Sequence, residues 1–170
     1  MHKLIVMRHG EAEPIMQSDA QRALTASGKQ ACLNAANGLL AKNANALHRL
    51  QIFYSPYRRT TETANLVASQ LDANQHHLKP SKACSQLLSE KSPGELITWL
   101  DNLEIAGPKH LMLVSHQPLV SSLLALLLEG TSDFSNMKKY PMWPASVAVL
   151  QFEYLAAGCA QLISLSHYAQ

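Results

Sequence analysis

The sequence predicts an α/β fold with three layers, α/β/α, in which helices cover both faces of a mostly parallel central sheet. Three short, nearly continuous apolar runs, residues 3–7, 50–54 and 111–115, have the pattern of strands buried on both faces of such a sheet. Helical patterns separate these runs, and this alternation is typical of a layered α/β domain. The chain has 170 residues, 47% of them hydrophobic, which is the size and apolar content of one domain spanning residues 1–170.

Two helices are expected in the first half of the chain, each after one of the apolar runs. Residues 28–42 are rich in alanine and leucine, and Thr25 or Ser27 can cap the start of that helix. Residues 60–71 place their apolar side chains on one helical face, which predicts an amphipathic helix packed on the sheet.

The second half of the chain predicts two more helices and two more strands. A helix is expected to begin at Ser92, because a cap residue, a proline and Glu95 three residues after the cap together mark a helix start. Residues 119–128 are apolar nearly all round, which predicts a helix in the centre of the fold. Residues 147–152 and 162–165 are β-branched or alternate in polarity, and we expect them to form an antiparallel pair at one edge of the sheet.

Charge and composition exclude several classes of protein. Lys and Arg number 14 against 12 Asp and Glu, and a net charge of +2 is too small for a protein specialised for nucleic acid or anionic membranes. The most apolar stretch is about half the roughly 20 residues that span a bilayer, so no membrane span is expected. The first ten residues lack the long apolar region of a signal peptide, and we expect a cytoplasmic protein. Three well-separated cysteines and the lack of a His-Glu-x-x-His sequence predict no metal and no cofactor.

Unusual polar residues stand directly after each of the three buried strands. Arg8 and His9 follow the first, Arg58 and Arg59 the second, and His116 the third. The carboxyl ends of parallel strands meet at one edge of the sheet, where open α/β domains bind ligands. Arginine presents a planar fork of donors to phosphoryl oxygens, and a histidine can attack phosphorus. The sequence therefore predicts a phosphate site at this edge.

Each of these residues has an ordinary explanation when it is taken alone. An Arg-His pair after a strand is usually a surface turn, adjacent arginines are usually a solvated helix start, and helix capping fully explains Glu95. The joint arrangement favours the site, because three independent accidents would have to fall on the same edge. The loop before the first helix, residues 18–28, can also bring Arg22 over that edge.

Four motifs in this order resemble the histidine phosphatase, or phosphoglycerate mutase-like, superfamily. They are Arg-His-Gly-Glu at residues 8–11, Leu-Thr-x-x-Gly at 24–28, Ser-Pro-x-x-Arg-x-x-x-Thr at 55–63 and Ser-His-x-Pro at 115–118. The short chain, the lack of a large inserted cap and the Ser-Asp-x-x-Arg-x-Leu-Thr segment at residues 18–25 are similar to the SixA branch, whose members act on phosphohistidine in signalling proteins.

The resemblance implies a role for each matching residue. His9 is expected to be the nucleophile, and Arg8, Arg59 and His116 are expected to form the phosphate pocket. Arg22 is expected to be a further contact to the substrate. Arg58 lies one position off the motif and is not expected in the pocket.

One position departs from the pattern of superfamily members that hydrolyse phosphate esters. Many of them carry a glutamate after the second helix as general acid for the leaving alkoxide, whereas an approximate alignment places Gln86 there, with Glu90 as the nearest acid. An alkoxide needs protonation to leave, while the imidazole of a phosphohistidine leaves readily once its nitrogen is protonated. This departure favours a phosphohistidine substrate.

These observations predict a metal-independent protein histidine phosphatase that forms a phospho-His9 intermediate. Its partner is expected to be a phosphohistidine-containing phosphotransfer domain or carrier, and the protein is expected to be a monomer. One alternative is a phosphatase or mutase acting on a small phosphate ester, with Glu11 or Glu90 as the acid. Another is a non-catalytic phosphate-binding or phosphorelay module in which His9 only holds a phosphoryl group.

The stretch from residue 130 to 144 is predicted to be a long loop. Its basic and aromatic side chains could line the rim of the site and contact an acidic partner, since such residues are common in interfaces. These side chains are Lys138, Lys139, Tyr140, Met142 and Trp143.

Overall fold

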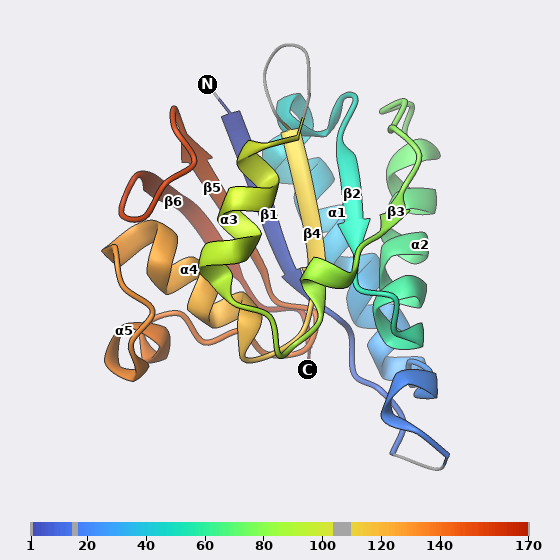
Figure 1. Ribbon diagram of the computed structural model, residues 1–170. Coiled ribbons are helices and arrows are strands. Elements are labelled where there is room, and N and C mark those ends of the chain that lie inside the picture. Colours follow the sequence, from blue (N-terminus) through green and yellow to red (C-terminus); the bar gives the residue numbers. More distant parts are fainter. Residues whose placement is uncertain (1, 15–16, 104–109, 170) are drawn as a thin grey trace.

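A six-stranded mixed sheet forms the centre of the molecule in the computed structural model, which describes residues 2–14, 17–103 and 110–169. The strand order is β3-β2-β4-β1-β5-β6. The strands are β1 (His2–Arg8), β2 (Gln51–Tyr54), β3 (Lys82–Ala83), β4 (His110–Ser115), β5 (Val147–Phe152) and β6 (Ala160–Ser166). The pairs β1–β4, β4–β2 and β2–β3 are parallel, whereas β5 and β6 form the predicted antiparallel extension. The arrowheads of β1, β2 and β4 therefore point to one edge, the lower one in Figure 1.

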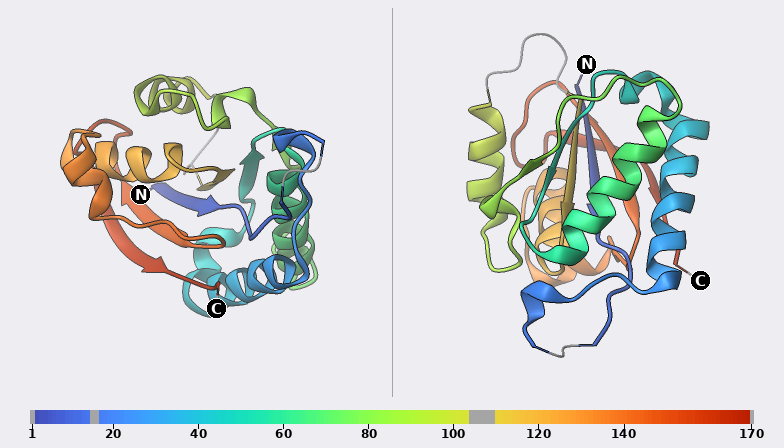
Figure 2. Two further views of the ribbon diagram at one scale, coloured as in Figure 1. Left: turned by 90° about the horizontal axis from the view of Figure 1, so that it is seen from below. Right: turned by 90° about the vertical axis from the view of Figure 1, so that its right-hand side faces the viewer.

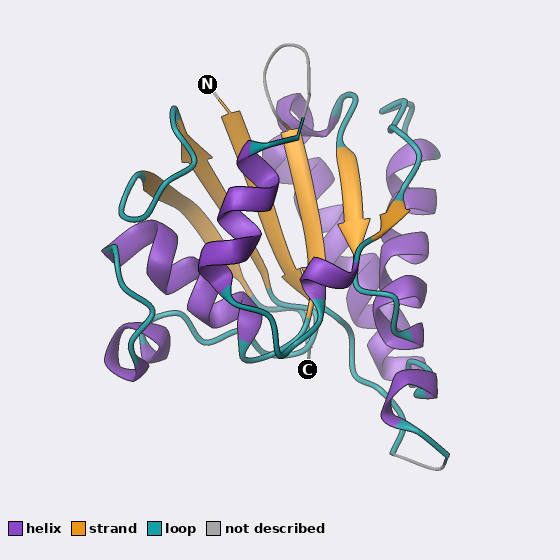
Figure 3. Cartoon of the chain, in the orientation of Figure 1, coloured by secondary structure: helices purple, strands orange, loops and turns teal. Residues whose placement is uncertain are grey.

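Helices cover both faces of this sheet, which confirms the predicted three layers. They are α1 (Ala26–Leu47), α2 (Arg58–Asp72), α3 (Pro93–Asp101), α4 (Leu119–Glu129) and α5 (Phe134–Lys138), with short 3-10 turns η1 (Asp19–Gln21) and η2 (Ser85–Leu87). Helices α1 and α2 pack on one face and α3 and α4 on the other (Figures 2 and 3).

The alternation of side chains along each strand divides the core into two parts. In β1, Ile5 and Met7 join the cluster under α1 and α2, while Leu4 and Val6 join the cluster under α3 and α4. All four side chains have no exposed surface, as expected for a central strand. The burial of β1 on both faces fixes the position at which the chain leaves the sheet, just before His9.

Several elements differ from the sequence prediction. The stretch from residue 130 to 144 is more than a loop, because Asp133 caps the short helix α5 by accepting from the N–H of Asn136 at 2.9 Å. Strand β3 has only two residues, too few for a periodic signal. Ser92 does precede α3, but its side chain makes no cap hydrogen bond, so the predicted capping box is not formed. Pro93 in the first turn and the burial of Leu96 hold this helix start instead.

Candidate active site

The strand-end cavity lies where β1, β2 and β4 end, and it has a volume of about 360 Å³. The sheet brings together residues that are far apart in sequence, because Arg8 ends β1, Ser55 follows β2 and His116 follows β4. The cavity is lined by Arg8, His9, Glu11, Ala12, Asp19, Arg22, Arg59, Ser89, His116, Gln117 and Pro144. All five site residues predicted from the sequence are in this lining.

His9 presents an unprotonated ring nitrogen. Its Nδ1 lies 2.6 Å from the carbonyl oxygen of Gly10, and a carbonyl only accepts hydrogen bonds, so the hydrogen of the neutral ring is on Nδ1. Nε2 therefore carries a lone pair, which accepts from Nε of Arg59 at 3.2 Å. Burial, together with the smaller effects of His116, Arg59 and Arg8, lowers the pKa of His9 to about 3, although the hydrogen bond to Gly10 acts in the opposite direction. At neutral pH this imidazole is therefore uncharged.

Close packing against α1 explains the glycine after His9. A Cβ on Gly10 would lie 2.7 Å from Sγ of Cys32 and 2.7 Å from the carbonyl oxygen of Gly28. The N–H of Gly10 donates to the hydroxyl of Thr63 in α2 at 3.1 Å. The hydroxyl of Thr63 in turn donates to the carbonyl of Arg59 at 2.7 Å, which ties the end of β1 to the first turn of α2.

Arg59 is the central cation of the cavity. It is 5% exposed, and its Nη1 and Nη2 donate to the backbone oxygen and the carboxylate of Asp19 at 2.6 and 2.9 Å. Its guanidinium also lies 5.0 Å from the ring centroid of Tyr57. Each terminal nitrogen keeps a second N–H with no partner among the described residues, so the side chain retains donors for a phosphoryl group.

Arg8 and His116 complete the inner wall. Nη1 of Arg8 donates to the carbonyl of Met142 at 2.9 Å, and burial and the neighbouring Arg59 lower the pKa of Arg8. Nε2 of His116 lies 2.7 Å from the hydroxyl of Ser55, and its ring packs edge-on against His9 at 5.2 Å. Burial lowers the pKa of His116 to about 4. Both Nε of Arg8 and Nδ1 of His116 are buried and without a partner among the described residues.

Arg22 and Asp19 come from the loop before α1 and close the outer side. Nη1 of Arg22 is 3.1 Å from Oδ1 of Asp19, and its other donors bind the backbone oxygens of Ala12 and Glu13. Partial burial raises the pKa of Asp19, but hydrogen bonds from Arg59 and Arg22 outweigh this and leave the pKa below its usual value. The Asp19 carboxylate is therefore ionised at neutral pH between two arginines.

The structure adds two residues to which the sequence analysis assigned no role. Asp19 contacts both Arg59 and Arg22, and the sequence analysis noted it only as a member of the segment at residues 18–25. Tyr57 packs edge-on against His116 at 5.1 Å and stacks under Arg59, and nothing in the motif pointed to it. Arg58 is exposed and pairs with Glu62 at 2.7 Å, outside the lining of the cavity.

The carboxylates considered as general acids do not have the environment of a proton donor. Glu11 accepts hydrogen bonds from Ser27 and from Thr25, the latter at 2.7 Å, and these lower its pKa. Glu90 is exposed and does not line the cavity, and neither does Gln86. The segment after α2 contributes Ser89, which has no acidic proton at neutral pH.

The two lysines at the end of α5 do not line the rim of the site, where they were expected. Lys139 pairs with Glu129 at 2.7 Å, and Lys138 lies over the ring of Phe134 at 4.3 Å, so neither lines the cavity. The carbonyl of the buried Met142 accepts from Arg8 and Gln117, and thus supports the site from below.

Comparison with known proteins agrees with this arrangement. A family model described as the histidine phosphatase superfamily (branch 1) matches residues 4–81. A curated phosphohistidine phosphatase SixA homolog from Haemophilus influenzae is 30% identical over 154 residues, which cover 88% of each chain. The solved structure of the protein histidine phosphatase SixA complexed with tungstate has a TM-score of 0.78 at 23% identity and covers 97% of this chain and 96% of that chain. A mycobacterial glucosyl-3-phosphoglycerate phosphatase has a TM-score of 0.65 at 17% identity, with 99% of both chains covered.

A neutral histidine facing an arginine-lined cavity at the carboxyl ends of parallel strands is suited to bind a phosphoryl group and attack its phosphorus. The chain belongs to the histidine phosphatase superfamily and is a phosphatase. Within the described parts of the chain, no helix is long and apolar enough to cross a membrane, and His, Cys, Asp and Glu nowhere form a group of three or more that could hold a metal.

Proposed function

We propose that this phosphatase removes the phosphoryl group from a phosphohistidine side chain of a partner protein and forms phospho-His9 on the way. The observation that carries this proposal is the state of His9, whose unprotonated Nε2 faces the arginines of the strand-end cavity. A neutral imidazole held beside Arg8 and Arg59 can attack phosphorus while the guanidinium groups balance the charge on the phosphoryl oxygens.

In the first step, Nε2 of His9 forms a bond to phosphorus as the bond from phosphorus to the substrate imidazole breaks. A phosphohistidine that is protonated on its other ring nitrogen releases a neutral imidazole, so the leaving group needs no further proton. The hydrogen on Nδ1 of His9 stays hydrogen-bonded to the Gly10 carbonyl, and the ring becomes a phosphorylated imidazolium. The reaction transfers a phosphoryl group from one imidazole ring to another, and the spare N–H donors of Arg59 hold its oxygens.

In the second step, water attacks phosphorus from the side that the substrate imidazole has left. The His9 ring leaves as neutral imidazole with its hydrogen still on Nδ1, and the proton of the attacking water goes to the phosphate product. His116 and Arg8 both have an unpartnered buried nitrogen at this wall, which supports a role for them in holding phosphoryl oxygens. The steps use no metal ion, because the arginines supply the positive charge.

The chemistry of the cavity favours a phosphoramidate over a phosphate ester. Both carboxylates in the lining, Asp19 and Glu11, have lowered pKa values and are poor proton donors near neutral pH. An alkoxide leaving group requires such a donor, and a neutral imidazole does not. The likeness of this fold to a sugar-phosphate phosphatase keeps a small ester as the second candidate.

Phosphate release from a purified phosphohistidine protein tests the proposal, with a panel of metabolite esters measured in parallel. We expect turnover of the phosphoprotein at least a hundred times faster than that of any ester, and loss of turnover in His9→Ala. Acid-sensitive labelling of the wild type, absent in His9→Ala, would identify phospho-His9. The matched control is His48→Ala, an exposed histidine at the end of α1.

Faster turnover of an ester would replace this proposal with the small-molecule alternative. Phospho-His9 that forms and persists without release of phosphate would instead indicate a phosphorelay module. Full activity of His9→Ala would exclude His9 as the nucleophile.

A further inference from the structure

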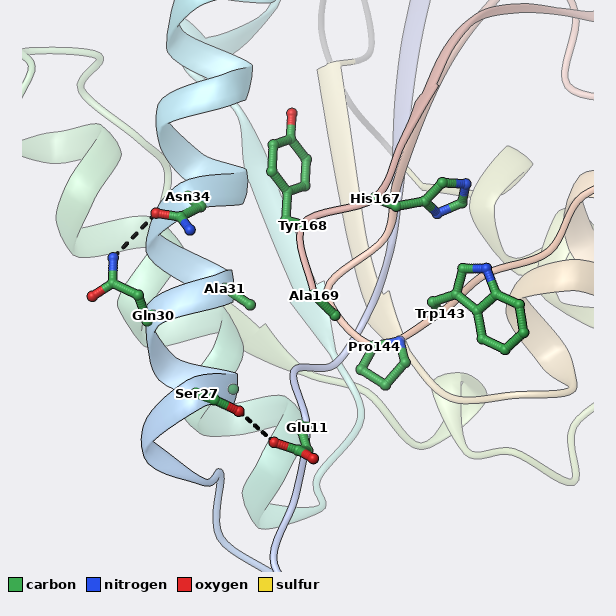
Figure 4. A pocket seen from close by; sticks show the side chains of 11 residues that line it. Glu11, Ser27, Gln30, Ala31, Asn34, Trp143, Pro144, His167, Tyr168 and Ala169 are labelled. Atoms are coloured by element: carbon green, nitrogen blue, oxygen red, sulfur yellow. Dashed lines mark hydrogen bonds between the residues drawn. The ribbon is translucent and has the colours of Figure 1, made fainter.

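A second hollow adjoins the strand-end cavity. This α1–tail groove has a volume of about 520 Å³ and lies between α1 and the two chain segments that face it (Figure 4). It shares Glu11 and Pro144 with the strand-end cavity, so the two spaces are neighbours. Its other lining residues are Ser27, Gly28, Gln30, Ala31 and Asn34 from the α1 side, and Trp143, His167, Tyr168 and Ala169 opposite.

The walls of the α1–tail groove are held in place by contacts outside it. Nδ1 of His167 lies 2.7 Å from the hydroxyl of the fully buried Ser146. The Tyr168 ring packs on the core under α1, and its hydroxyl lies against Gly38, where a Cβ would collide with it. A groove with fixed walls binds a partner without a large cost in ordering its own side chains.

Trp143 lines the groove, but the rest of the chain does not bury its side chain. Its side chain is 59% exposed, and its indole N–H has no partner among the described residues. An exposed tryptophan beside a functional cavity is typical of a residue that anchors a partner, because it offers a large apolar surface and one donor. On the opposite wall, Gln30 and Asn34 are linked by a 3.1 Å hydrogen bond and leave further amide groups free for a polypeptide backbone.

The charge of the groove restricts its partner. Among the described residues of the lining, Glu11 is the only Asp, Glu, Lys or Arg, and its carboxylate is kept ionised by hydrogen bonds from Ser27 and Thr25. The basic side chains expected to attract an acidic partner are engaged elsewhere, Lys139 by Glu129 and Lys138 by Phe134. A segment entering the groove therefore meets apolar side chains, amide groups and one carboxylate, a surface that is complementary to a neutral or basic segment.

We propose that the α1–tail groove binds the polypeptide next to the phosphohistidine of the partner protein, and that this segment is apolar and neutral or basic. The inference rests on the proposed function, since it supplies that reaction with its protein specificity. The strand-end cavity holds the phosphohistidine ring and phosphoryl group, and the groove holds the adjoining chain against Trp143 and Asn34. An imidazole phosphate without a polypeptide uses the cavity alone.

Two substrates separate the contribution of the groove from the chemistry. One is a phosphohistidine peptide with apolar and lysine flanks, and the other is phosphoimidazole. We expect Asn34→Arg and Trp143→Ala to raise KM for the peptide about tenfold, which corresponds to about 1.4 kcal/mol, with kcat nearly unchanged. Neither variant should alter kcat/KM for phosphoimidazole by more than about twofold.

The matched control for Asn34→Arg is Asn37→Arg, the same change on the same helix. Asn37 is exposed but faces α2, where it accepts from Gln70 at 2.8 Å. The control for Trp143→Ala is Tyr154→Ala, because Tyr154 is 76% exposed and follows β5, whose carboxyl end lies at the end of the sheet opposite the strand-end cavity. Both controls should keep the wild-type KM for the peptide.

The outcomes distinguish the two proposals. If the wild type hydrolyses neither phosphohistidine substrate, the proposed function fails. If it hydrolyses both and the two groove variants keep the wild-type KM for the peptide, the groove inference alone is overturned. It is also overturned if glutamate flanks give a lower KM than lysine flanks. Finally, it is overturned if the groove variants abolish a concentration-dependent dimer, because the occupant of the groove would then be a second copy of the chain.

Discussion

Thr63 shows how one hydroxyl links two parts of the candidate site. It accepts from the N–H of Gly10 and donates to the carbonyl of Arg59, so the residue after the proposed nucleophile and the central arginine share one partner. The hydroxyl is fully buried and also lies 3.6 Å from the thiol of Cys32. A change at Thr63 is therefore expected to move both sides of the strand-end cavity.

Removing a buried histidine should change the acid stability of the protein. The pKa values of His9 and His116 are lowered to about 3 and about 4 by burial, whereas unfolded histidine titrates near 6.5. Below pH 6.5 the unfolded chain takes up protons that the folded chain does not, so stability falls as the pH falls toward 4. Each histidine contributes about 1.4 kcal/mol per pH unit to this slope.

Urea unfolding between pH 7 and pH 4 measures the effect. His9→Gln is expected to flatten the dependence of the unfolding free energy on pH, and the double change with His116→Gln should flatten it further. The exposed His48→Gln serves as the surface control and should follow the wild-type curve. An unaltered slope in the double variant would contradict burial of neutral imidazoles.

Asp19 should weaken the binding of free phosphate. Its carboxylate occupies donors of Arg59 and Arg22, and its negative charge repels an oxyanion in the same cavity. In Asp19→Asn we expect the inhibition constant of inorganic phosphate to fall several-fold, because the change removes the charge and keeps the shape. Competitive inhibition against phosphoimidazole measures this constant, with Asp133→Asn at the start of α5 as the control. An equal or higher constant in Asp19→Asn would show that the carboxylate does not compete with phosphate.

Helix α1 supports the segment that carries His9, the proposed nucleophile. Thr25 caps it by accepting from the N–H of Gly28 at 2.9 Å, which confirms one of the two predicted caps. Gly28 then meets the backbone of Glu11 so closely that a Cβ would collide with its carbonyl oxygen. The glycine in the second motif is required by contact between two backbones rather than by backbone torsion.

Substitution of this glycine should be costly. Gly28→Ala is expected to lower the free energy of unfolding by about 2 to 3 kcal/mol, because neither backbone can yield without moving the end of β1. Gly94→Ala in α3 is the matched control, since its nearest contact would be the Ser92 hydroxyl at 3.6 Å. Alanine also favours the helix there, so we expect no loss of stability. Chemical denaturation measures both values, and equal stability of the two variants would contradict the close contact.

The long elements could be predicted from the sequence, and the short ones could not. The buried runs and the central helix α4 have strong apolar patterns, and the structure places them where they were expected. Strand β3 exists because backbone groups near Lys82 pair with β2, and such pairing leaves no periodic trace in two residues. The helix start at Ser92 was predicted correctly, and its proline lies in the first turn as expected, but the expected side-chain cap is not formed.

Across the whole molecule, the sheet topology explains which site residues were predictable. Arg8, His9, Arg59 and His116 follow buried strands or a motif attached to one, so their convergence could be inferred from the carboxyl ends of parallel strands. Asp19 lies in a loop that returns over the site, and loop paths do not follow from periodicity. The groove could not be anticipated either, because its walls come from α1 and from residues after β6.

The position of β1 within the sheet also affects how the molecule opens. β1 is hydrogen-bonded on both sides, to β4 and β5, whereas β6 is an edge strand whose far side is unpaired in the sheet. Amide exchange should therefore be slowest in β1 and faster in β6 and the tail that follows it. Fraying from this edge would release His167 and Tyr168 while His9 is still anchored, so the groove proposed to bind a polypeptide would open before the strand-end cavity does.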